Sequence, residues 1–189
     1  MKLGKTFYAA DRKAWRAWLA KNGAKEREVW LVYYRKHSGK PRVSYNDAVD
    51  EALCFGWIDG TVKRIDGERY AQRFTPRRAN SQLSQLNKER VRVLIAQKRM
   101  TQAGLKAIAH AYDAKADHLK VRLARDVSAA LRKNPAAWKH FKKFPEGYKR
   151  IRVAYIEGQR HYSPESFRKR LAHFVRMTAQ NKRFGFVRD

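Results

Sequence analysis

Apolar residues near the start of the chain follow first a helical and then a strand-like spacing. Trp15, Trp18 and Leu19 recur at i, i+3 and i+4 after Asp11, whose side chain suits a helix N-cap. Residues 28–36, EVWLVYYRK, are rich in aromatic and β-branched side chains. This composition predicts a buried strand after the first helix.

The next segment predicts a helix followed by a β-hairpin. Ser44-Tyr45-Asn46-Asp47 matches a capping box that opens a helix over residues 48–55, and Gly56 suits the position just past its end. Residues 57–65 then predict one strand, and residues 69–75 predict its returning partner.

The rest of the chain carries helical signals. Capping residues, first-turn prolines and apolar spacing predict helices over residues 81–99, 101–116, 126–133, 135–143, 146–157 and 164–182. The fold class expected is α+β: an N-terminal helix plus a small antiparallel sheet with a β-hairpin, followed by an all-helical C-terminal part. We expect an α+β domain over 1–97 and a basic helical region over 98–189. The second either packs on the first as one unit or is separated from it near residues 117–125.

Positive charge is in large excess over the whole chain. The 189 residues hold 44 Lys+Arg against 17 Asp+Glu, a net charge of +27. Residues 1–95 hold 21 against 10, and residues 96–189 hold 23 against 7, so the helical part is the more basic. Such a surplus predicts attraction to nucleic acid, anionic lipid or acidic proteins, unless it is simply a solvated basic surface.

Cysteine content and hydropathy narrow the class of protein. The single cysteine excludes an internal disulfide and a cysteine-rich zinc site. The N-terminus lacks the apolar run of a signal peptide, and the longest apolar runs are too short to span a bilayer. We therefore expect a cytoplasmic protein without a membrane span.

One group of residues has metal-ligand chemistry. The group is His110, Asp113, Asp117 and His118, and the first three would share one helix face if the helix ran that far. A polar helix surface is the more common reason for such a group, so no metal site and no cofactor is expected.

The best candidate for an anion site lies after the second hairpin strand. Arg73, Arg77 and Arg78 cluster around Pro76, and a predicted helix begins shortly afterwards. Guanidinium groups bind phosphate or carboxylate bidentately, and helix N-termini favour anions. The alternative is a solvated basic turn.

Asp59 has two interpretations. It either pairs with Lys63, Arg73 or Arg77 to fix a corner of the fold, or it lines a pocket with Trp57 and orients a ligand. Together, the candidate ligand-binding residues are Trp57, Asp59, Lys63, Arg73, Arg77 and Arg78.

Cys54 is the only cysteine in the sequence and therefore the one candidate thiol nucleophile. It lies near the predicted C-terminus of a helix, where the helix dipole disfavours a thiolate, and between Leu53 and Phe55. A buried, inert thiol is the favoured interpretation, and no catalytic residue is predicted.

Several long motifs are similar to one bacterial family. The run EALCFGWIDGTVKRIDGERYAQRFTPRR, followed by NKERVRVLIAQKRMTQAGLKAI, resembles the YdeI/OmpD-associated family, also called bacteriocin-protection proteins. The segments VWLVYYRKHSGKPRVSYNDAVDEAL, AWKHFKKFPEGYKRIRVAYIEG and RKRLAHFVRMTAQNKR fit as well. One position departs from the family pattern S-x-W-S-x-x-N: Leu83 stands where the family usually has tryptophan.

The resemblance implies tolerance of bacteriocins and cationic antimicrobial peptides, and by name an indirect link to an outer-membrane porin. We therefore expect a non-enzymatic stress-tolerance protein that binds an anionic ligand or an acidic protein partner. Two alternatives stay open: non-specific nucleic-acid binding through the basic surface, and an enzyme with an unrecognised site near Cys54, Asp59 and Arg73.

Overall fold

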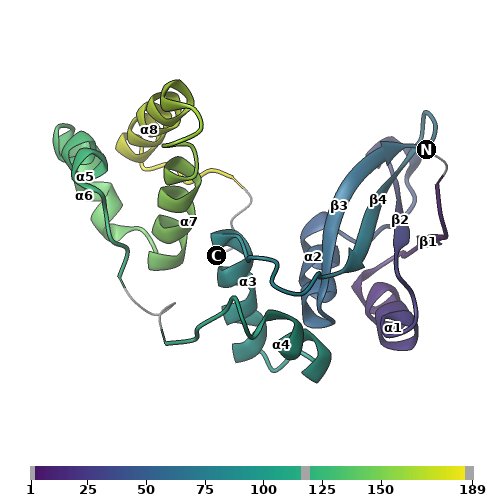
Figure 1. Ribbon diagram of the computed structural model, residues 1–189. Helices are drawn as coiled ribbons and strands as arrows, with labels where there is room; N and C mark the ends of the chain where they lie inside the picture. The colour runs from purple at the N-terminus through teal and green to yellow at the C-terminus, as the bar shows by residue number, and fades with distance from the viewer. Residues whose placement is uncertain (1–2, 116–119, 186–189) are drawn as a thin grey trace. The chain divides into compact units, whose positions relative to one another are not determined.

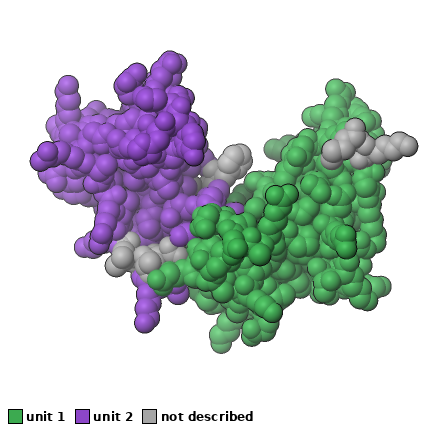
Figure 2. Space-filling model, in the orientation of Figure 1, with its two compact units in different colours: residues 1–83, 90–113 green, residues 84–89, 114–189 purple. Residues whose placement is uncertain are grey.

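The computed structural model describes residues 3–115 and 120–185 (Figure 1). The chain divides into two compact units, one of residues 1–83 and 90–113 and the other of residues 84–89 and 114–189 (Figure 2). Each unit has its own hydrophobic core.

A four-stranded sheet organises the first unit. Its strands β1 (Thr6–Tyr8), β2 (Val29–Tyr34), β3 (Trp57–Arg64) and β4 (Arg69–Pro76) lie in the order β1-β2-β4-β3. The β3–β4 hairpin and the β2–β4 pair are antiparallel, as predicted, whereas β1 is a parallel edge strand that was not expected. The α+β class is thus confirmed.

Two helices cover one face of this sheet: α1 (Arg12–Asn22) and α2 (Tyr45–Cys54) (Figure 1). Alternation along β2 places Val29, Leu31 and Tyr33 in the core beneath them. The two residues between these three pack on the opposite face of the sheet. Because both faces are covered, β2 is apolar throughout, which is why its sequence predicted a buried strand.

The predicted helix caps are present. The Asp11 carboxylate accepts a hydrogen bond from the Ala14 amide at 2.8 Å, and the Ser44 hydroxyl accepts one from the Asp47 amide at 3.1 Å. Gly56 follows α2 with a φ of +75°, the left-handed conformation expected at that position. Local sequence therefore determines where α1 begins and where α2 begins and ends.

The outer side of α2 packs on a second group of helices. Apolar residues of α2 meet those of α3 (Gln85–Ala96) and α4 (Gln102–Ile108) in a cluster that includes Leu83. Leu83 is buried, so the position where the family pattern has tryptophan still serves the core. The helix containing α4 was predicted to reach Ala116, which lies outside the described residues, but α4 already ends at Ile108.

Two helices end before their predicted C-termini because a residue shortly after each end adopts a left-handed backbone conformation. Lys98 follows α3 and Asn181 follows α8, and both have a φ of 55°. A left-handed residue cannot continue an α-helix. The predicted ranges 81–99 and 164–182 were therefore too long at their C-terminal ends.

The second unit is helical in its described part. It contains α5 (Arg125–Arg132), α6 (Pro135–Lys143), α7 (Glu146–Glu157) and α8 (Pro164–Ala179), close to the predicted ranges. Its core consists of Val127, Leu131, Ala137, Phe141, Phe144, Tyr148, Ile156, Phe167 and Phe174. No helix within residues 3–115 and 120–185 combines the length and the apolar character needed to cross a bilayer.

Candidate functional site

Trp57 is a core residue of the first unit. Its ring is 1% exposed, meets Trp18 edge-on at 5.9 Å, and donates a hydrogen bond from Nε1 to the Gly23 carbonyl at 3.1 Å. A ring so enclosed has no face left for a ligand. Trp57 therefore closes the corner between α2 and β3 and does not line an open cleft.

Asp59 lies beside Trp57 on β3, next to an irregularity in the pairing with β4. Its carboxylate accepts hydrogen bonds from Tyr45 Oη and Gln72 Nε2, both at 3.0 Å. Two of the cations considered as its partners are engaged elsewhere: Arg73 pairs with Glu28 at 2.5 Å, and Arg77 binds backbone carbonyls. Lys63 lies further along β3, where its side chain is part-exposed.

The three arginines after the hairpin do not converge on one another. Arg73 extends from β4 to Glu28, Arg78 is exposed, and Arg77 is buried. Arg77 Nη2 donates to the Gln82 carbonyl at 2.9 Å, and burial lowers the pKa of this guanidinium. The anion site at these arginines stays a prediction, because the described geometry gives Arg77 a structural role in holding the turn before α3.

Cys54 is completely buried at the end of α2. Burial, and then the nearby Glu51 carboxylate, raise the pKa of the thiol to about 11, although Arg16 and Arg99 act in the opposite direction. Because the reactive species is the thiolate, this environment disfavours a nucleophilic role.

The Cys54 thiol is therefore expected to react with iodoacetamide only when the protein unfolds. A pKa near 11 lowers the thiolate fraction at neutral pH roughly a hundredfold relative to a free thiol, and burial blocks access. The matched control is Tyr162→Cys, since Tyr162 is 89% exposed, and its added thiol should react quickly in the folded protein. Alkylation of Cys54 at a comparable rate under native conditions would contradict the assignment.

The metal-like group does not assemble in the described chain. Asp117 and His118 lie outside the described residues, and His110 hydrogen-bonds the Ser81 carbonyl at 3.0 Å. Within residues 3–115 and 120–185, no three His, Cys, Asp or Glu side chains are placed to hold a metal ion.

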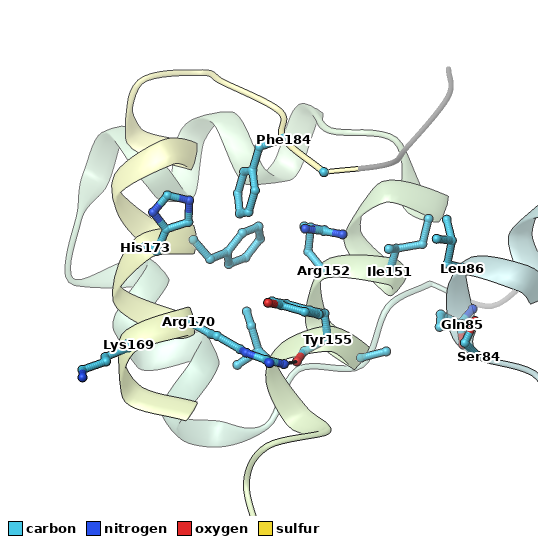
Figure 3. Close-up of a pocket in the computed structure, with 14 residues that line it drawn as sticks. Ser84, Gln85, Leu86, Ile151, Arg152, Tyr155, Lys169, Arg170, His173 and Phe184 are labelled. Atoms are coloured by element: carbon cyan, nitrogen blue, oxygen red, sulfur yellow. Dashed lines mark hydrogen bonds between the residues drawn. The ribbon is translucent and has the colours of Figure 1, made fainter. Parts of the chain in front are cut away.

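The second unit contains a pocket of about 860 Å³ (Figure 3). It lies among α7, α8 and the segment after α8, with the start of α3 at its edge. Its walls are mostly apolar and include Leu86, Ile151, Tyr155, Phe174 and Phe184. A volume of this size suits a small organic ligand.

Arg152 is the buried cation of this pocket. Its side chain is 8% exposed and its Nε is buried without a hydrogen-bond partner. The guanidinium lies near the rings of Tyr155 and Phe184, at 5.3 and 5.0 Å from their centroids (Figure 3). Burial lowers the pKa of Arg152, while Tyr148 and Tyr155 raise it, and no described carboxylate pairs with it.

The backbone after α8 lies directly against Arg152. A Cβ built on Gly185 would lie 2.7 Å from Arg152 Nη1, and Gly185 has a φ of +90°. The conformation favours glycine here, and with any larger residue the Arg152 guanidinium would have to shift. The close approach helps to shield the guanidinium from water.

The rim of the pocket carries further cations. Arg170 stacks over the Tyr155 ring at 3.8 Å and donates from Nη1 to the Tyr155 carbonyl at 2.8 Å. Lys169 pairs with Glu165 at 2.6 Å, and the His173 ring meets Phe184 edge-on at 4.7 Å. None of the described lining residues is Asp, Glu or Cys, so the pocket favours anions.

Sequence reasoning missed this pocket. Arg152 lies in YKRIRVAYIEG, where basic residues suggest a solvated helix surface. The signal that could have revealed it is the helical spacing: Tyr148, Arg152 and Ile156 recur at i, i+4 and i+8 and so share one face. Because the residues one turn before and one turn after Arg152 on this face are apolar or aromatic, Arg152 is directed toward the interior.

Two family models match the chain. One, a domain of unknown function named DUF8412, matches residues 7–107, more than half of the chain. The other, described as bacteriocin-protection, YdeI or OmpD-associated, matches residues 120–181, which contain Arg152. No curated protein and no solved structure matches the sequence. The chain belongs to the DUF8412 family, and the resemblance to the YdeI/OmpD-associated family is shown over residues 120–181, whereas the motifs quoted from the N-terminal half fall almost wholly within the DUF8412 match.

Proposed function

We propose that this protein is a non-enzymatic binding protein of the bacteriocin-protection type, and that its C-terminal unit binds an anionic ligand at Arg152. The observation that carries the proposal is a buried guanidinium that no described carboxylate pairs with, in a ligand-sized pocket. The description of the family matched by residues 120–181 supports a role in tolerance of bacteriocins. We place this role in the cytoplasm.

The energetics of Arg152 favour binding of an anion. An isolated charge is costly to remove from water, and buried charges in proteins are normally paired. Of the other buried arginines, Arg90 pairs with Asp50 at 2.5 Å, and Arg77 donates to the Gln82 carbonyl at 2.9 Å. No described carboxylate pairs with Arg152, and a bound anion would supply such a partner.

The side chains around the pocket favour binding over covalent chemistry. Apart from Arg152, its charged lining groups Lys169 and Arg170 are engaged with Glu165 and Tyr155. His173 contacts Arg176 at 2.9 Å. These contacts hold cations around the pocket, and they provide no activated nucleophile with a positioned base.

Arg152→Met is expected to abolish stabilisation by anions without unfolding the protein. Thermal unfolding would be followed with inorganic phosphate, benzoate and octanoate at constant ionic strength, with chloride as the reference. A binding anion at 100 times its Kd should stabilise wild-type protein by about 2.7 kcal/mol and leave the variant unchanged. The ligand-free variant should match or exceed wild-type stability, by up to about 1 kcal/mol, because an unpaired buried charge is removed.

The matched control is Arg168→Met, which removes an exposed arginine from α8 and should keep the response to anions. Equal responses of wild-type protein and Arg152→Met to every anion would contradict the proposal.

The charge surplus of residues 96–189 favours non-specific nucleic-acid binding as the second candidate function. That function predicts affinity for a short DNA duplex that falls steeply with salt and is the same in both arginine variants.

A further inference from the structure

We infer that the ligand of the Arg152 pocket is an amphiphilic carboxylate, with one carboxylate on an aliphatic or aromatic body. The inference rests on the proposed function and specifies its ligand. Three features of the pocket carry it: the way in which Arg152 is held, the number of unpaired buried charges, and the character of the walls.

The first feature is the surroundings of the guanidinium. The rings of Tyr155 and Phe184 pack against it, and its Nε has no partner (Figure 3). Ring contacts use the faces of a guanidinium, whereas its hydrogen bonds lie in its plane. A carboxylate accepts hydrogen bonds in this plane, and it would reach Arg152 through the Nη atoms, because Nε is itself enclosed by protein.

The second feature is the balance of charge. Arg152 is the buried cation of the lining, while Lys169 already pairs with Glu165, and Arg170 is stacked on Tyr155. One unpaired buried positive charge is neutralised by one negative charge. A multiply charged ligand such as a nucleotide would leave uncompensated negative charge among apolar walls.

The third feature is the apolar lining. Leu86, Ile151, Phe174 and Phe184 border a space of about 860 Å³, far more than a carboxylate alone would fill. A small hydrophilic anion would leave these walls in contact with water. Each methylene of a ligand that becomes buried there should tighten binding about fourfold.

The test compares ligands that differ in body and in head group. Isothermal titration would measure acetate, butyrate, hexanoate and octanoate, with octanamide and octylamine as the neutral and cationic counterparts of octanoate. N-acetyl-phenylalanine and its amide form an aromatic pair that also represents a peptide C-terminus. We expect Kd to fall at least tenfold from butyrate to octanoate, and the amide and the amine to bind at least tenfold more weakly than the carboxylate.

A wall variant completes the design. Ala154 lines the pocket and is exposed, so Ala154→Phe should fill the space without disturbing the core, and it should weaken octanoate more than acetate. If acetate or phosphate binds as tightly as octanoate and needs Arg152, the proposed function stands and the inference fails. If octanoate binds equally to wild-type protein and Arg152→Met, both fail. Tighter binding of octanoate would identify an acyl chain as the body of the ligand. Tighter binding of N-acetyl-phenylalanine would identify an aromatic or peptide source.

Discussion

Replacing Gly104 by alanine is expected to destabilise the protein by about 3 kcal/mol, although alanine is the better helix former. A Cβ on Gly104 would lie 2.2 Å from the Cys54 carbonyl oxygen and 2.7 Å from its carbon. These are backbone atoms of α2, so no flexible side chain can move aside. The helices must separate, and overpacking of this kind typically costs 1–3 kcal/mol before any lost hydrogen bonds.

Hydrogen bonds between the same segments add to this cost. The Thr101 amide and hydroxyl both donate to the Cys54 carbonyl, at 3.0 and 2.7 Å, and the Gly104 amide donates to the Thr101 hydroxyl at 3.1 Å. Moving α4 away from α2 would break or lengthen them, at about 1 kcal/mol each. The gain in helix propensity, about 1 kcal/mol, offsets only part of the loss.

Chemical denaturation of Gly104→Ala beside Gly67→Ala measures this effect. A Cβ at Gly67 would meet no atom within 4 Å, and the residue does not adopt a left-handed φ. Gly67→Ala should therefore change stability by less than about 0.5 kcal/mol. Equal stability of the two variants would mean that α2 and α4 are not held in backbone contact.

Local signals in the sequence were sufficient for most of the first unit. Asp11 and Ser44 mark helix starts, and Gly56 marks a helix end, through interactions that span only a few residues. The β3–β4 hairpin follows from two strand-like runs joined by a short turn. The strand β1 was not predictable in this way, because three residues carry little pattern and its pairing with β2 is made at a distance.

The candidate site was harder to predict because it depends on contacts far apart in sequence. Trp57 and Arg77 looked available for a ligand, yet the fold buries both. The sequence did not single out Arg152, yet α8 and the residues after it enclose it. Residue type identifies which groups can bind anions, but burial decides which of them lacks a partner, and burial is set by tertiary packing.

Glu51→Gln is expected to be the other strongly destabilising substitution, by about 3 kcal/mol. The Glu51 side chain is fully buried on α2 and accepts hydrogen bonds from Arg12 at 2.5 Å, Arg16 at 2.6 Å and Arg99. It thereby joins α1, α2 and the segment before α4. Glutamine keeps the shape but removes the charge, which leaves three guanidiniums converging on a neutral amide.

Comparison with Glu28→Gln separates burial from ion pairing as such. Glu28 pairs with Arg73, but their side chains are 34% and 39% exposed, so losing this pair should cost less than about 1 kcal/mol. Similar losses of stability for the two variants would show that burial of Glu51 adds nothing to its contribution to the free energy of unfolding.

The pH dependence of Glu51→Gln provides an independent check. Burial raises the pKa of Glu51, but hydrogen bonds from Arg12, Arg16 and Arg99 outweigh it, so the folded-state pKa lies below the ordinary value of 4.5. A depressed carboxylate pKa stabilises the fold fully above the unfolded-state value, and this contribution is lost as the pH falls through the folded-state value. The stability difference between wild-type protein and Glu51→Gln should therefore be constant between about pH 5 and 7 and shrink below about pH 4. A difference that stayed unchanged in acid would show that the ionised carboxylate does not cause it, and that shape alone accounts for the loss.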